Sequence, residues 1–157
     1  MQGNPMFMEK AIALATENVT SGRGGPFGAV IVRDGEIIAT GANLVTATND
    51  PTAHGEIVAI RNACTALGRF QLTGCHIYTS CEPCPMCLGS IYWARPKRVI
   101  YANTKQDAAA INFDDDFIYN EIQTEMVDRK IPFVHHPHPK AKEVFANWKN
   151  SESKIKY

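Results

Sequence analysis

Strand and helix patterns alternate through the middle of this 157-residue chain, and this alternation constrains its fold more than any other feature. Short β-rich runs at 28–32 and 36–39 flank Asp34-Gly35, a pair typical of a hairpin because glycine adopts a positive φ at low cost. Helical and strand patterns then alternate over residues 54–67, 75–79, 86–94 and 97–102. A strand–helix–strand order implies right-handed crossovers and a central sheet covered by helices. The sequence therefore predicts an α/β protein.

Weaker patterns flank this middle part. Apolar residues at helical spacing predict a helix over 7–19, and a polar loop is expected over 43–52. Towards the end of the chain we expect a short helix at 117–122, a further strand at 131–134 and a helix at 143–148. No internal repeat and no linker-like stretch precedes about residue 135, so we expect a single domain over residues 1–157.

The composition argues against several classes of protein. Hydrophobic residues make up 45% and charged residues 20%, which is typical of a globular chain rather than a disordered one. The formal net charge of +0 argues against roles that need a strong overall field, such as coating nucleic acid, but not against a local basic patch. No run approaches the roughly 18 apolar residues of a membrane span, and residues 1–10 lack the pattern of a signal peptide. We therefore expect a cytoplasmic protein with reduced cysteines.

Two short segments carry the chemistry. They are Pro51-Thr52-Ala53-His54-Gly55-Glu56 and Glu82-Pro83-Cys84-Pro85-Met86-Cys87. In the second segment two thiols lie one turn apart at a helix start, where the helix dipole favours thiolates, and thiolates bind zinc well. His54 is the natural third ligand, which leaves one position of a tetrahedral zinc open, as in catalytic sites. Glu56 is then placed to take a proton from water that the zinc has made acidic.

Other interpretations of the cysteines stay open at this point. Cys64, on a helical apolar stripe, and Cys75, at a strand start, are expected to be buried filler. Cys81 forms a second C-x-x-C pair with Cys84. As a fourth ligand it would make the zinc structural and the protein a non-catalytic zinc-containing binding module. A thioredoxin-like redox pair is a further alternative, but it gives the first segment no role.

The two segments together resemble the cytidine deaminase superfamily, whose signature is H-x-E followed by P-C-x-x-C. Further stretches resemble its purine branch, and within that branch the guanine deaminases: residues 25–30, 49–54, 79–87 and 113–119, with an aromatic chain end. The chain departs from the family at Gly55, where alanine is usual, and a glycine there costs up to roughly 1 kcal/mol of helix stability. The resemblance implies a three-layer α/β/α cytidine deaminase-like fold with a central mixed sheet of about five strands.

The resemblance also implies an activity and a set of residues. The activity is zinc-dependent hydrolysis of guanine to xanthine and ammonia, with one zinc per subunit and Glu56 carrying the proton. The implied substrate-binding residues are Asn43, Phe27, Trp93, Asp115 and Tyr157. Without the family, the ring side chains of Phe27 and Trp93 are more typical of a core, Asn43 of a turn, and Asp115 of a solvated turn or helix start. The family further implies a homodimer in which residues from about 135 to 157 are exchanged, so that Tyr157 completes the partner's site.

Guanosine deaminase and tRNA adenosine deaminase are the alternative activities. The segment from residue 135 onward carries five lysines and two glutamates, a mild positive patch that RNA would favour. Three consecutive aspartates at 114–116 would repel phosphate, so nucleic acid is not an expected partner, and the lack of an apolar span argues against a membrane as well. The cluster His135-His136-Pro137-His138 is expected to be a solvated loop rather than a metal site.

Overall fold

The computed structural model describes residues 3–113 and 115–157, which fall into two compact units, Met1–Asp115 and Asp116–Tyr157. The first unit contains α1 (Pro5–Thr20), β1 (Gly28–Arg33), β2 (Glu36–Ala42), α2 (Val45–Thr48), α3 (Gly55–Leu67), β3 (His76–Cys81), α4 (Pro85–Ala94), β4 (Arg98–Asn103) and α5 (Lys105–Ala109). The second unit contains α6 (Asp116–Gln123), the 3-10 helix η1 (Met126–Asp128) and α7 (Pro139–Asn150).

The sheet of the first unit is mixed, with strand order β2-β1-β3-β4. Strand β1 runs antiparallel to both β2 and β3, whereas β3 and β4 are parallel and joined through α4. The β1–β2 hairpin turns at Asp34 and Gly35, which both have positive φ. The predicted hairpin and the predicted alternation of strands and helices are thus present in the structure.

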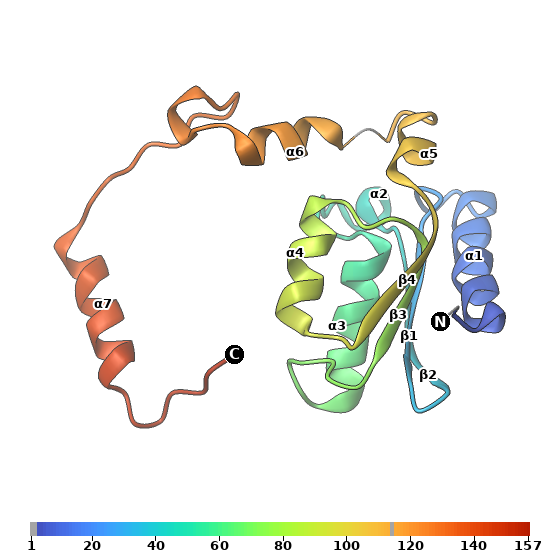
Figure 1. Cartoon of the computed structure of the whole chain (residues 1–157), viewed down its shortest axis with the longest axis horizontal. Helices are drawn as coiled ribbons and strands as arrows, with labels where there is room; N and C mark the ends of the chain where they lie inside the picture. The colour runs from blue at the N-terminus through green and yellow to red at the C-terminus, as the bar shows by residue number, and fades with distance from the viewer. Residues whose placement is uncertain (1–2, 114) are drawn as a thin grey trace. The chain divides into compact units, whose positions relative to one another are not determined.

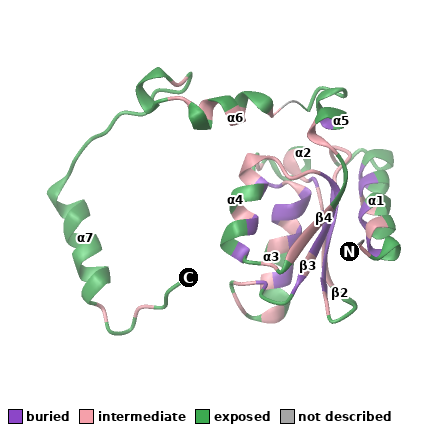
Figure 2. Cartoon of the chain, viewed as in Figure 1, coloured by how far each residue is buried: buried purple, intermediate pink, exposed green. Residues whose placement is uncertain are grey.

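Helices cover both faces of this sheet, as Figure 1 shows: α1 lies on one face, and α3 and α4 lie on the other. Successive residues of β1 divide between two core clusters because side chains alternate along a strand. Ala29 and Ile31 pack with residues of α3 and α4, whereas Val30 and Val32 pack with Phe7 of α1. The buried positions in Figure 2 concentrate on the strands and on the helix faces turned towards them.

Helix α3 packs unusually close to the sheet at Gly41 of β2. A Cβ atom at this position would lie 2.3 Å from the carbonyl oxygen of Gly55 and 2.4 Å from the amide nitrogen of Ala59. Both atoms belong to the backbone of the first turns of α3. The absence of a side chain at Gly41 therefore sets how near the start of α3 lies to the sheet.

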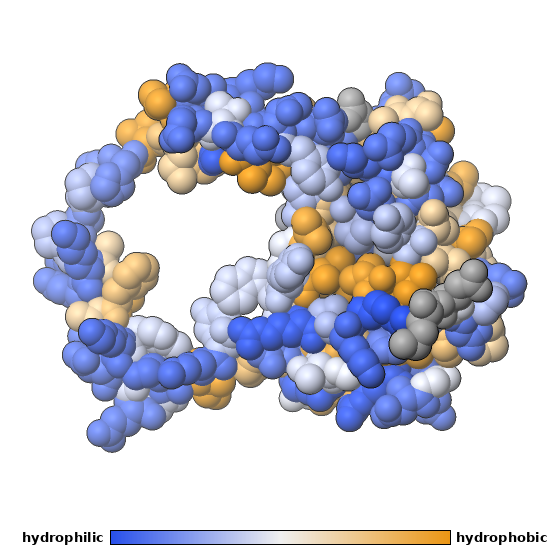
Figure 3. Space-filling model, in the orientation of Figure 1, coloured by the Kyte–Doolittle hydropathy of each residue, from blue (hydrophilic) through white to orange (hydrophobic). Residues whose placement is uncertain are grey.

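The second unit has no buried residue among those that the structure describes, and Figure 2 shows it mostly exposed, with a few half-buried positions. One group of its apolar side chains lies on α6 and the segment that follows, as Figure 3 shows. There, Phe117, Ile118, Ile122, Ile131 and Phe133, with Glu121, Arg129 and Lys130, line a hollow of about 370 Å³. None of the described helices in either unit is both long and apolar enough to cross a membrane.

Two expectations about the elements were wrong or incomplete. The described residues form a sheet of four strands rather than about five, because the expected strand at 131–134 is irregular backbone. Pro132 lies within that segment and lacks the amide hydrogen that a strand ladder uses. The short helices α2 and α5 were not expected, although Thr104 and Asp107 form a capping box at the start of α5.

Candidate metal centre

The two chemistry-bearing segments begin two helices on the same face of the sheet. His54 is the N-cap residue of α3, and Cys84 is the N-cap residue of α4, followed by Pro85 in the first turn. Both N-cap residues have extended backbone, and Cys87 lies one turn into α4. Helix N-termini carry partial positive charge, so this arrangement favours thiolates.

The distances among the three side chains suit a tetrahedral metal ion. The Sγ atoms of Cys84 and Cys87 each lie 3.5 Å from Nδ1 of His54, and all three ligand atoms lie within 4.8 Å of one another. With the usual zinc–sulfur and zinc–nitrogen bond lengths, two ligands of a tetrahedral zinc are about 3.6 Å apart. Among the described residues this is the group that could hold a metal ion, and its three ligands leave one coordination position open.

The two thiols of the site have their pKa values shifted in opposite directions. Hydrogen bonding with Cys87 and, more weakly, with His54 lowers the pKa of Cys84 to about 4, although burial opposes the shift. The same bond to Cys84, together with burial, raises the pKa of Cys87. The bond to Cys84 also raises the pKa of His54, and the negative charge of Asp115 contributes to that shift. A bound metal replaces the protons of its ligands, so binding is expected to release protons.

Glu56 lies beside the ligands in the first turn of α3 and is 6% exposed. Its Oε1 accepts a hydrogen bond from Oγ1 of Thr79 at 3.3 Å, and its Oε2 lies 3.5 Å from Sγ of Cys87, which donates to it. Burial raises the pKa of this carboxyl group. A carboxyl group with a raised pKa exchanges protons more readily near neutral pH, as general acid–base chemistry requires.

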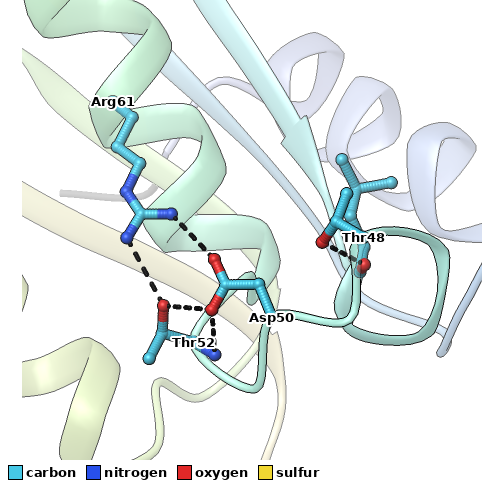
Figure 4. Close-up of polar contacts among 5 residues, drawn as sticks. Thr48, Asp50, Thr52 and Arg61 are labelled. Atoms are coloured by element: carbon cyan, nitrogen blue, oxygen red, sulfur yellow. Dashed lines mark hydrogen bonds and ion pairs between the residues drawn. The ribbon is translucent and has the colours of Figure 1, made fainter.

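The turn before His54 is held by Asp50, as Figure 4 shows. Oδ1 of Asp50 accepts hydrogen bonds from the amide nitrogen and the hydroxyl of Thr52 at 2.8 and 2.7 Å. Its other oxygen lies 3.3 Å from the guanidinium of Arg61, two turns into α3. The bonds from Thr52 and then Arg61 lower the pKa of Asp50. The loop and the helix that flank His54 are thereby tied to each other.

The comparison with known families accounts for this arrangement. Residues 1–103 match the model of the cytidine and deoxycytidylate deaminase zinc-binding region, and this stretch contains all three ligands and Glu56. The chain belongs to the cytidine and deoxycytidylate deaminase family. The family is zinc-binding, and in this deaminase His54, Cys84 and Cys87 are positioned to bind the ion.

Individual relatives extend the likeness beyond residue 103. The chain is 56% identical to guanine deaminase of Bacillus subtilis over 151 residues, which are 96% of this chain and 97% of the relative. A crystal structure of guanine deaminase from the same organism superposes with a TM-score of 0.96 at 54% identity, covering 99% of each chain. A tRNA-specific adenosine deaminase of Aquifex aeolicus is 31% identical over 93% of both chains.

The expected substrate residues of this deaminase occupy different settings. Asn43 is 6% exposed, and its Oδ1 accepts a hydrogen bond from the amide of Val45 at 3.3 Å. The ring of Phe27 meets that of Phe113 edge to face, with centroids 4.9 Å apart. Trp93 is exposed on α4. Asp115 is half-buried and close enough to His54 to influence its pKa. These positions leave the substrate roles as predictions.

The last expected substrate residue, Tyr157, lies in the second unit of this deaminase, where its side chain is 66% exposed. Asp114, the first residue of the aspartate run, lies outside the described residues. The role of Tyr157 stays a prediction.

Three contributors to the site of this deaminase were not foreseen from the sequence. Thr79 contacts Glu56, and Phe113 contacts Phe27. The third is Asn18, a fully buried residue of α1. Its Nδ2 donates to the backbone carbonyl of Gly25 at 2.9 Å and to that of Asn43 at 2.7 Å. No local pattern marks these three residues, because each acts on a segment distant in sequence.

The other cysteines of this deaminase lie outside the candidate metal group. Cys81 is buried, and its thiol donates to the backbone carbonyl of Thr104 at 3.6 Å. Burial raises the pKa of Cys81 to about 11, which keeps this thiol protonated. Cys75 and Cys64 pack in or against the core cluster between the sheet and the helices α3 and α4. All five cysteines are free thiols.

Proposed function

We propose that this protein is a zinc-dependent guanine deaminase, which hydrolyses guanine to xanthine and ammonia. The observation that carries the proposal is the buried carboxyl group of Glu56 beside a His, Cys, Cys zinc site with one open position. The likeness to a guanine deaminase over both units supports guanine as the substrate. The likeness to a tRNA-specific enzyme is weaker in sequence.

His54, Cys84 and Cys87 would hold the zinc ion. A zinc ion there would make water acidic enough to supply a nucleophile near neutral pH. The two helix starts fix the ligands, and the sheet behind them excludes bulk water from one side of the site.

Glu56 would move protons during the reaction. Its carboxylate would accept a proton from the attacking water and pass it to a ring nitrogen of guanine. It would then take the proton of the hydroxyl newly bound to the ring carbon and pass it to the amino group, which leaves as ammonia. Water and guanine are consumed, and xanthine and ammonia leave, so the carboxylate returns to its starting state. The raised pKa of Glu56 supports this cycle, because the group then holds a proton more easily between the steps.

The predicted substrate residues would divide the recognition of guanine. Phe27 and Trp93 would pack on the purine ring, and Asn43 would hydrogen-bond its edge. Asp115 would accept hydrogen bonds from the N–H groups of guanine, a task that an adenine reader does not need. The negative charge of Asp115 helps to raise the pKa of His54, which supports a position of Asp115 near the reacting groups.

The proposal includes a homodimer in which the segment from about 135 to 157 is exchanged and Tyr157 completes the partner's site. The apolar side chains that the second unit exposes on α6 support a partner surface. We also propose a reducing cytoplasm as its location, because oxidation of Cys84 or Cys87 would destroy the zinc ligands.

An assay of ammonia release from candidate substrates tests the proposed activity. We expect the zinc-loaded protein to act on guanine, and not on guanosine, adenine, cytosine or a tRNA anticodon stem-loop. Turnover of guanosine or the stem-loop without turnover of guanine would overturn the proposal.

Glu56→Gln should keep zinc and lose turnover by about 10²–10⁴-fold or more. Asp115→Asn should chiefly weaken guanine use, and unchanged kcat and KM would remove Asp115 from recognition.

Mixing two inactive variants tests the exchanged dimer. A Glu56→Gln chain and a Tyr157→Ala chain can form one intact site in a heterodimer only if Tyr157 acts in the partner's site. Random mixing then restores about a quarter of the wild-type sites. If Tyr157 acts in its own chain, mixing restores nothing.

A further inference from the structure

Glu56 is held by few groups, although the proposed reaction depends on where its two oxygen atoms lie. In the described part of the chain, two side chains donate to its carboxyl group: Thr79 to Oε1 at 3.3 Å and Cys87 to Oε2 at 3.5 Å. A thiol is a weak donor, and a cysteine that ligates a metal does so as a thiolate without a proton. Once Cys87 serves as a ligand, the hydroxyl of Thr79 is the side-chain donor that remains.

The sheet places this hydroxyl firmly. Thr79 lies in the middle of β3, between Ala29 of β1 and Tyr101 of β4, and is 1% exposed. Because side chains alternate along a strand, Thr79 points to the same face as Ile77, which packs against α3 and α4. Threonine is also stiff about χ1, so its hydroxyl has little freedom to leave the carboxyl group.

We infer that Thr79 is a positioning residue for the proposed deamination: its hydroxyl fixes Oε1 of Glu56 so that Oε2 faces the metal ligands. This inference rests on the proposed function, since it assigns Thr79 a role in a reaction that Glu56 performs. The bond from Thr79 acts on one oxygen only, which leaves the other free to exchange protons with substrate and water. A residue with a purely structural role would only need to satisfy its own buried hydroxyl.

Two substitutions at Thr79 separate these roles. Thr79→Val keeps the shape of the side chain and removes the donor, whereas Thr79→Ser keeps the donor. We expect Thr79→Val to bind one zinc per chain and to lose about 10- to 100-fold in kcat, with KM within about threefold of wild type. Thr79→Ser should recover most of the lost kcat. A Thr79→Val protein with wild-type kcat, or a Thr79→Ser protein as slow as Thr79→Val, would overturn the inference.

Ser80 provides a matched control on the same strand. It is buried too, but its hydroxyl accepts a hydrogen bond from the amide of Gly28 at 3.0 Å on the opposite face of the sheet. Ser80→Ala should lower the melting temperature and keep kcat. An equal loss of kcat in Ser80→Ala would show a general effect of buried hydroxyls and would count against Thr79.

A crystal structure of zinc-loaded Thr79→Val keeps this test independent of the substrate. We expect the Glu56 carboxyl group to rotate or to occupy more than one conformation, and an unchanged Glu56 would refute the inference. If the wild-type protein does not act on guanine, the proposed function fails, and the orientation of Glu56 in the two crystal structures still decides the role of Thr79.

Discussion

A methyl group at Gly41 should push the start of α3 away from the sheet. The added Cβ would lie 2.3 Å from the carbonyl oxygen of Gly55 and 2.4 Å from the amide nitrogen of Ala59, and neither backbone atom can rotate away. Ordinary contact then requires a displacement of about 1 Å. Overpacking of this kind lowers the free energy of unfolding by about 1–3 kcal/mol. For a chain of this length, that corresponds to a fall in Tm of about 2–12 °C.

The same displacement reaches the reacting groups, because Gly55 lies between His54 and Glu56. A misplacement of about 1 Å lowers turnover by up to about a hundredfold. We therefore expect Gly41→Ala to lose activity at 25 °C even where circular dichroism shows it fully folded. Thermal melts, zinc content and ammonia release from guanine, measured on one preparation, provide the three readouts.

Gly89→Ala adds the same methyl group without the clash. Gly89 lies within α4, and a Cβ there would have no atom within 4 Å apart from its chain neighbours and the backbone of its own helix. Alanine is the better helix former, so this variant should gain about 0.5–1 kcal/mol and keep its turnover. If Gly41→Ala melts and turns over like the wild type while Gly89→Ala behaves as expected, the close approach of α3 to the sheet is not what places Glu56.

Three further predictions follow from the site and its supports. Gly55→Ala should keep turnover and raise Tm by at most about 3 °C. Alanine lowers the entropy of the unfolded chain, which favours folding, whereas its Cβ would lie 3.3 Å from the carbonyl oxygen of Phe27, which opposes it. A clear fall in Tm would show that the contact dominates. In zinc-free protein, iodoacetamide at pH 6 should modify Cys84 first, because its pKa of about 4 makes it a thiolate at that pH, with the rate falling as the pH approaches 4. Zinc should protect Cys84, and mass spectrometry that finds the half-buried Cys64 modified first would contradict the assignment. Asn18→Leu should lower the free energy of unfolding by about 1–3 kcal/mol, because one buried and one half-buried backbone carbonyl lose their donor. Removal of the amide oxygen, which has no partner among the described residues, offsets part of this cost. An unchanged denaturant midpoint would refute the bridge.

The zinc ligands could be predicted because each motif determines its own geometry. Two cysteines at i and i+3 after a proline share one face of a helix start, whatever surrounds them. The contact of Thr79 with Glu56 has no such local signal, since it depends on how β3 lies against α3. The bridge from Asn18 depends in the same way on three segments meeting. Spacing in the sequence carries no information about these meetings.

The strands and helices whose apolar residues recur at strand or helix spacing were also predicted, with shifts of a few residues at their ends. The expected strand at 131–134 was wrong because β-branched and aromatic residues give the pattern of a strand whether or not a neighbouring strand exists to pair with. Pro132 was the available warning. The division of the chain after Asp115 had no signal either, because the aspartate run there continues directly into α6.

All three metal ligands and Glu56 lie in the first turns of two helices, within the first 87 residues of the chain. Of the five residues proposed to contact the substrate, Asp115 and Tyr157 come later in the chain, whereas Phe27, Asn43 and Trp93 share residues 1–103 with the reactive centre. If Asp115 and Tyr157 take the proposed roles, insertions or exchanges after Asn103 change which heterocycle is accepted while the ligands and Glu56 stay fixed. A library that seeks a new substrate would therefore keep residues 1–103 constant and vary the remaining third of the chain.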